Sequence, residues 1–225
     1  MCFFSSQTKK AIEIARRYRR QPGIVEMAEQ IIQEQKIIKA YQHPDCLIVT
    51  PGVELQTAKW GLIPFWVRDV EKVESIRSMT ANAKAETAFE LPSFREAIKK
   101  RRCLIPSTGY FEYHHEEKEA IPYHIFLRDT EIFSLAGMYE EWLHPDTKET
   151  IRTFSVLTVP ANELCAYIHN GGRNLGRMPA ILPPEKEKTW LRQDLTKEEI
   201  NRLLIPYDSL RMDACALEKD YLKRV

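Results

Sequence analysis

The chain opens with Met1-Cys2, and a cysteine in second position can do chemistry that no internal cysteine can. Cysteine is small enough for the initiator methionine to be trimmed, which would leave an α-amine and a thiol on one residue. Their ordinary pKa values, about 7.7–8.0 and about 8.5, keep both groups partly nucleophilic near neutral pH. With an aldehyde, the amine can form a Schiff base and the thiol can then close a thiazolidine ring. The alternative is that Cys2 is an ordinary second residue, since a two-residue signal is short.

Two titratable residues could move protons in such a reaction. Strand alternation places Glu112 on one face with Tyr110 and His114, and bulky neighbours would desolvate its carboxylate and raise its pKa. His169 has an ordinary pKa suited to proton transfer near neutrality. The alternatives are an exposed strand glutamate and a structural histidine.

Polar residues in two further stretches could bind a sugar or a phosphate. Asn82 lies in the stretch 81–87, which is also typical of a turn that leads into a helix. The two glycines before Arg173 could present backbone N–H groups to a phosphate, with Arg173 and Arg177 supplying positive charge. The same glycines would also suit a surface loop.

Metal and cofactor chemistry is not indicated. The cysteines are scattered, odd in number and form no CxxC pair, which argues against a disulfide framework and a structural zinc site: Cys2, Cys46, Cys103, Cys165 and Cys215. His114 and His115 are adjacent, so on a strand they point to opposite faces and cannot easily share a metal. We expect reduced thiols, no metal and no cofactor.

The bulk composition is that of a soluble globular protein. The 225 residues are 44% hydrophobic and 29% charged, which suits one domain over 1–225. No apolar run could cross a bilayer and no signal peptide is visible, so we expect a cytoplasmic protein. The net charge of +1 cannot attract a polyanion at long range. Two local basic clusters are more typical of solvated helix faces than of binding sites: Arg16, Arg17, Arg19 and Arg20, and Lys99, Lys100, Arg101 and Arg102.

Periodicity predicts the elements that must position these residues. Ser5 and Ser6 would cap a helix with Ala11, Ile14, Ala15 and Tyr18 on one face. Further helices are predicted near 24–32, after Pro92 up to residue 102, at 161–168 and at 184–204. Strands are predicted within 46–60 and at 103–106, 110–115, 123–128, 133–142 and 151–159, separated by short polar turns. Such strands pair antiparallel, so the expected fold is α+β, with a mainly antiparallel sheet or open-barrel core flanked by helices.

Together these stretches resemble the SRAP (SOS response-associated peptidase) family, whose members sense abasic sites in DNA. The matching pieces follow one order from the first residues to about Pro183: Met1-Cys2, WGLIPFW at 60–66, NAKAET at 82–87, RCLIP at 102–106, GYFEY at 109–113, AGMY at 136–139, Thr158 with Ala161-Asn162, Ile168-His169, and RMP at 177–179 before Ile181-Leu182. Each piece is short, but the ordered set is specific.

The resemblance implies a positively lined groove for single-stranded DNA and a covalent bond from Cys2 to C1′ of an abasic deoxyribose. Asn82 would position the opened sugar or its phosphate, and Glu112 would act as acid or base beside the Cys2 amine. His169 would protonate the sugar oxygen during ring opening and assist reversal.

The resemblance also implies DNA contacts and self-processing. The DNA contacts would be Lys84, Trp66, Arg173 and Arg177. The family name reflects a proposed self-removal of the initiator methionine.

Three departures from the family pattern affect the groove. The family usually continues Cys-Gly-Arg, whereas this chain has Cys2-Phe3-Phe4, so an arginine contact is missing and a phenylalanine could stack on a base or pack in the core. Tyr41-Gln42-His43-Pro44 replaces a common Asn-x-Ala-Pro-Gly stretch. Seven residues separate His169 from Arg177, where one is usual.

The leading hypothesis is a DNA-damage protein that shields abasic sites by a reversible thiazolidine crosslink. Single strands are favoured because unpairing a duplex nucleotide costs a few kcal/mol. One alternative is an N-terminal-nucleophile cysteine amidohydrolase acting on small amides. Another is a non-covalent single-strand DNA-binding module in which Cys2 is inert.

Overall fold

The computed structural model describes residues 3–22, 37–117, 119–172 and 175–224, and a closed ring of five strands lies at its centre. Four of the five pairings are antiparallel, and only β4 and β10 run parallel. The ring strands are β3 (Asp45–Val49), β4 (Leu55–Trp60), β6 (Arg102–Ser107), β9 (Phe133–Leu143) and β10 (Thr150–Pro160). The predicted mainly antiparallel core is therefore confirmed, and the pairing of β9 with β10 closes it.

The ring is filled by apolar side chains and one satisfied amide. The Trp60 ring stacks on Phe154 with centroids 5.7 Å apart. The Gln7 amide is buried, and it bonds to both the N–H and the carbonyl of Leu47 and to the carbonyl of Pro106. A buried polar group with all these partners is tolerated in an apolar core.

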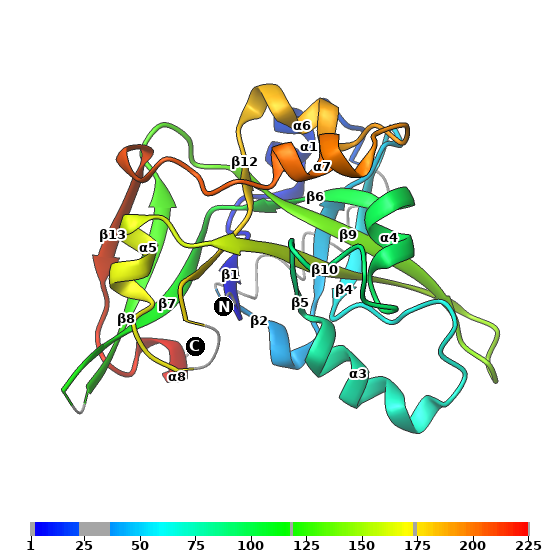
Figure 1. Ribbon diagram of the computed structural model, residues 1–225, viewed down its shortest axis with the longest axis horizontal. Helices are drawn as coiled ribbons and strands as arrows, with labels where there is room; N and C mark the ends of the chain where they lie inside the picture. The colour runs from blue at the N-terminus through cyan, green and yellow to red at the C-terminus, as the bar shows by residue number, and fades with distance from the viewer. Residues whose placement is uncertain (1–2, 23–36, 118, 173–174, 225) are drawn as a thin grey trace.

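A second antiparallel sheet flanks the ring and carries the start of the described chain. Its order is β13-β8-β7-β1-β2, and Figure 1 shows β7, β8 and β13 on the left of the ring strands. Its strands are β1 (Phe4–Ser6), β2 (Ile38–Lys39), β7 (Gly109–Glu116), β8 (Glu119–Leu127) and β13 (Met212–Ala216). Three more short strands extend the ring sheet: β5 (Asn82–Lys84), β11 (Arg177–Pro179) and β12 (Ile181–Leu182).

Seven α-helices are described, and they surround the sheets. Figure 1 shows α1, α6 and α7 above the ring and α3 below it. They are α1 (Ala11–Tyr18), α3 (Val73–Thr80), α4 (Arg95–Lys100), α5 (Glu163–Ile168), α6 (Pro184–Trp190), α7 (Lys197–Leu203) and α8 (Tyr221–Arg224). None of the helices within the described residues is both long and apolar enough to span a bilayer.

The predicted first helix is correct in its buried face and wrong in its cap. All four predicted core residues of α1 are buried. However, Ser5 and Ser6 belong to β1, and the helix begins at Ala11, after a Lys10 N–H that donates to the Glu13 carboxylate. Ser5 and Ser6 thus pair with β7 in a sheet, whereas the sequence pattern predicted that they cap the helix. The helix predicted at 24–32 lies outside the described residues.

Other predicted helices are shorter than the sequence pattern suggested. The helix expected up to residue 102 is reduced to α4, and the predicted 184–204 helix is two helices separated at 191–196. Neither α3 nor β13 was predicted. Short amphipathic segments such as these depend on tertiary packing more than on local propensity.

One residue of the second basic cluster does not lie on a solvated helix face. The Arg102 side chain is fully buried, and it donates to the carbonyls of Ile98, Lys99, Trp190 and Arg192. It therefore satisfies the orphan carbonyls where α4 and α6 end. The prediction of solvation was wrong for Arg102 because helix ends buried side by side need a donor.

Candidate active site

The buried face of β7 is covered by α5. Tyr110, Glu112 and His114 are all buried, with exposures of 1%, 8% and 9%. The Tyr110 hydroxyl lies 3.0 Å from Cys165 Sγ, and His114 Nδ1 lies 2.8 Å from the Tyr167 carbonyl oxygen. α5 is thus held to β7 by contacts with the residues two before and two after Glu112. Glu112 is a buried carboxylate rather than an exposed strand glutamate.

His169 follows α5 directly and is held against the same strand. Its backbone N–H donates to the carbonyl of Cys165, and its ring is buried. The next residue, Asn170, bonds through its side chain to both the N–H and the carbonyl of His115, at 2.7 and 2.9 Å. These bonds fix the position of the imidazole relative to β7.

Arg177 connects the histidine to the strand that carries Asn82. His169 Nδ1 is 3.4 Å from the Arg177 carbonyl oxygen. The Arg177 guanidinium binds both carboxylate oxygens of Glu86, at 2.6 and 2.8 Å, and the Thr158 carbonyl oxygen at 2.6 Å. The positive charge expected for a phosphate is therefore paired with a carboxylate, and Arg177 joins β11, β10 and the loop that follows β5.

Asn82 and Lys84 stand two residues apart on β5, so they share a face of the strand. Val156 pairs with Asn82 and Thr158 with Lys84, which places both beside the strand that binds Arg177. Asn82 is buried and Lys84 is exposed. The stretch 81–87, which the pattern also allowed to be a turn, therefore begins with a strand. The strand forms because β10 pairs with it, and no local pattern reveals that partner.

The start of the described chain runs along Glu112. β1 pairs with β7 in the register Phe4 to Phe111 and Ser5 to Tyr110, so the pairing ends at the residue next to Glu112. The Phe3 carbonyl accepts a hydrogen bond from the Ala40 N–H. Cys2 and Arg173 lie outside the described residues.

The two phenylalanines after Cys2 both take part in packing. Phe3 packs against the main core and Phe4 against the cluster around Phe111. Trp66 lies on the loop after β4, 46% exposed, with its indole N–H 3.3 Å from the Pro92 carbonyl oxygen.

Two residues near this group were not assigned a role from the sequence. Glu86 pairs with Arg177, as described above. Tyr167 is 61% exposed, and its ring stacks on His114 at 4.7 Å. The exposure of Tyr167 could have been predicted from the sequence, because Cys165 and Ile168 form the buried face of α5 and residue 167 lies outside that face.

Burial keeps three of the described thiols protonated. It raises the pKa of Cys165 to about 11, and it raises the pKa values of Cys46 and Cys103 still further. All three are poor nucleophiles near neutral pH, because the thiolate is the reactive form. Cys215 is the one free thiol that is exposed within the described part of the chain.

The ring of five strands and the flanking sheet define an α+β fold, and the buried polar residues on β7 and β5 belong to its candidate active site. The family model described as "SOS response associated peptidase (SRAP)" matches residues 1–222. The chain belongs to this family.

Individual relatives are similar over most of the chain. "Abasic site processing protein YoqW" of Bacillus subtilis is 39% identical over 158 residues, which cover 69% of this chain and 66% of the relative. "Abasic site processing protein YMR114C" of Saccharomyces cerevisiae is 32% identical over 164 residues, covering 70% and 41%. The match thus spans about two thirds of the first relative and less of the second. A crystal structure of a Bacteroides thetaiotaomicron protein is 49% identical with a TM-score of 0.95, covering 99% and 94%.

Proposed function

We propose that the protein processes abasic sites in single-stranded DNA by a reversible thiazolidine crosslink through Cys2, after Met1 is removed. The observation that carries this proposal is the register of β1 on β7. It brings the chain to within two residues of Cys2 beside a buried carboxylate, with His169 held against the same strand. The names of the relatives refer to abasic-site processing, and they support that part of the proposal.

The proposed reaction joins both functional groups of Cys2 to one carbon and releases one water. The ring-opened abasic sugar presents an aldehyde at C1′. The amine adds to C1′, and loss of water gives a Schiff base. The thiol sulfur then adds to C1′ while its proton goes to the nitrogen, which closes the thiazolidine. Reversal follows the same steps backwards and consumes the water.

Each buried polar residue has a proposed role in moving protons or holding the sugar. His169 donates the proton that the sugar ring oxygen needs on opening, and Asn82 holds the opened sugar. Glu112 accepts a proton from the Cys2 ammonium. This transfer is needed because a protonated amine has no lone pair with which to attack C1′.

Four residues are proposed to bind the strand. The exposed Lys84 offers its charge to a phosphate and Trp66 offers its ring to a base, and Arg173 and Arg177 are proposed as further phosphate contacts. A single strand is the proposed substrate because its sugar is accessible without unpairing. Self-removal of Met1 is also part of this proposal.

The test combines a denaturing gel with intact-mass measurement. The wild-type protein should lack Met1 and, with an abasic single-stranded oligonucleotide, should gain the mass of the oligonucleotide less one water. Cys2→Ala should give no adduct, whereas Cys215→Ser, the exposed-cysteine control, should react like the wild type.

Three outcomes would contradict the proposal. Normal crosslinking by Cys2→Ala, or retention of Met1 in the reactive protein, would rule out the aminothiol. Turnover of small amides without any DNA adduct would indicate the amidohydrolase. Salt-sensitive DNA binding that ignores both the lesion and Cys2→Ala would indicate a non-covalent binding module.

A further inference from the structure

A cavity of about 630 Å³ lies between α1 and α6, away from the candidate active site. Its lining comes from these two helices, the residues that follow them, the end of β3 and β6, and it includes none of the residues of the candidate active site. In Figure 1, α1 and α6 lie together above the ring, whereas β5 lies below them. The cavity is therefore separate from the site proposed for Cys2.

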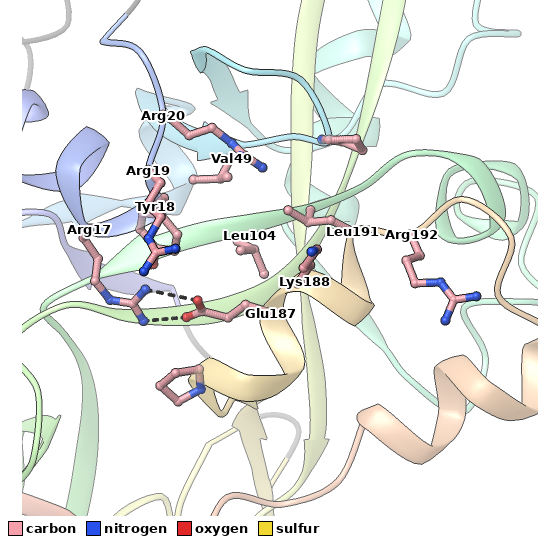
Figure 2. A pocket seen from close by; sticks show the side chains of 12 residues that line it. Arg17, Tyr18, Arg19, Arg20, Val49, Leu104, Glu187, Lys188, Leu191 and Arg192 are labelled. Atoms are coloured by element: carbon pink, nitrogen blue, oxygen red, sulfur yellow. Dashed lines mark hydrogen bonds and ion pairs between the residues drawn. The ribbon is translucent and has the colours of Figure 1, made fainter.

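The cavity is strongly basic. Five basic side chains and one acidic side chain line it, and Figure 2 shows Arg19 and Arg20 on the α1 side of the cavity with Lys188 on the opposite side. The one carboxylate, Glu187, is already bound by Arg17 at 2.7 and 3.1 Å and by the Ser134 hydroxyl at 2.8 Å. Arg192 is bound to Asp194.

Three cations remain without a carboxylate partner among the described residues: Arg19, Arg20 and Lys188. Arg20 donates to the Thr50 carbonyl at 3.2 Å, and its Nε is buried without a hydrogen-bond partner in the same part of the chain. Gathering like charges around a cavity costs free energy, and an anion bound there would offset that cost.

The backbone at Arg19 adds a second, independent observation. Arg19 ends α1 in the left-handed conformation, with φ 52° and ψ 47°. Glycine is the favoured residue at such a position because a side chain strains it. Arg19 therefore holds its charge at the cavity in a backbone conformation that would favour glycine.

The size and apolar lining of the cavity indicate what kind of anion fits. Val49, Leu104 and Leu191 line it beside the cations. A volume of about 630 Å³ is within the range of small-molecule sites and exceeds what a lone phosphate fills. Guanidinium groups pair with phosphate and also stack on the flat face of a base.

We propose that this cavity binds a nucleotide, with Arg19, Arg20 and Lys188 on its phosphates and the apolar lining against its sugar or base. The nucleotide is either free or part of a nucleic-acid strand, since both present the same chemistry. This proposal does not depend on the covalent function of Cys2.

The test is a calorimetric titration of the full-length protein with adenosine diphosphate, adenosine and inorganic phosphate. We expect saturable binding of the diphosphate and at least tenfold weaker binding of the other two. The double variant Arg20→Ala/Lys188→Ala should weaken diphosphate binding at least tenfold. The control Arg16→Ala/Lys186→Ala removes two exposed charges from the same helices outside the cavity lining, and it should change binding less than twofold.

Arg19→Gly separates ligand binding from folding. It relieves the left-handed strain, so the thermal midpoint should stay the same or rise while diphosphate binding weakens. Competition with an undamaged single-stranded oligonucleotide distinguishes the two sources, because a strand that uses the cavity will displace the diphosphate and a free-nucleotide site will not respond. The proposal is overturned if the diphosphate does not bind, if inorganic phosphate binds equally well, or if the cavity and control variants bind alike.

Discussion

Arg177 and Glu86 form a two-point ion pair, in which Arg177 Nη1 donates to Glu86 Oε1 at 2.6 Å and Nη2 donates to Oε2 at 2.8 Å. The Arg177 side chain is 11% exposed and that of Glu86 is 49% exposed. The arginine proposed to meet a DNA phosphate therefore already has an anionic partner that faces solvent. Any phosphate that reaches Arg177 must either displace the Glu86 carboxylate or share the guanidinium with it.

Glu86→Gln should strengthen non-covalent binding of a single-stranded oligonucleotide about threefold to tenfold, because it removes a competing negative charge and leaves Arg177 in place. Fluorescence anisotropy at several salt concentrations would measure this, and the salt dependence should become steeper. Arg177→Ala is the matched control and should bind more weakly. Weaker binding by Glu86→Gln would show that Arg177 needs the carboxylate to hold its position.

The same pair predicts a pH effect on stability. The hydrogen bond from Arg177 holds the pKa of Glu86 below its ordinary value of 4.5, so the pair stabilises the fold above about pH 4.5. This stabilisation is lost as the pH falls through the lowered pKa of the folded state. Because Glu86 is half exposed, the contribution should not exceed about 1 kcal/mol. Thermal midpoints of wild type and Glu86→Gln should converge between pH 5 and pH 3, and a constant difference would contradict the assignment.

Tyr167 should support a base of the bound strand. Its exposed ring is already oriented by stacking on His114, and one base stacked on an aromatic side chain contributes about 1–3 kcal/mol. Tyr167→Ala should therefore weaken oligonucleotide binding by about fivefold or more, while Tyr167→Phe should bind like the wild type. Equal losses in both variants would assign the effect to the hydroxyl rather than to stacking.

Gly109 is required because the His124 ring lies over it. An added Cβ would overlap that ring, so Gly109→Ala should destabilise the fold by about 1–3 kcal/mol in chemical denaturation. Gly52→Ala is the control, since its nearest neighbour would be Thr50 Oγ1 at 3.6 Å. Adding His124→Ala should recover part of the loss, and a purely additive double variant would refute the steric explanation.

The described cysteines should differ in how fast their thiols react with an alkylating reagent. Burial raises the pKa of Cys165 to about 11, so at pH 8 iodoacetamide should modify Cys215 readily and Cys165 only after unfolding. Cys46 and Cys103 should behave like Cys165. Peptide mapping by mass spectrometry would measure the order. Rapid labelling of Cys165 in the folded protein would mean that α5 opens away from β7.

The sequence alone indicated the proposed chemistry and most of the strands. The Met1-Cys2 start and the ordered motifs are local features of the chain, and the alternation around Glu112 is visible because side chains in a strand repeat every two residues. The buried face of α1 was predicted for the same kind of reason, since helical periodicity is local.

Only the tertiary structure decided how these pieces meet. β1 and β5 are three residues long, and each exists because a distant strand supplies its hydrogen bonds, β7 in one case and β10 in the other. The pairing of Arg177 with Glu86, 91 residues apart, and the burial of Arg102 between two helix ends follow from closure of the ring. Such contacts depend on long-range pairing, and no local period in the chain encodes them.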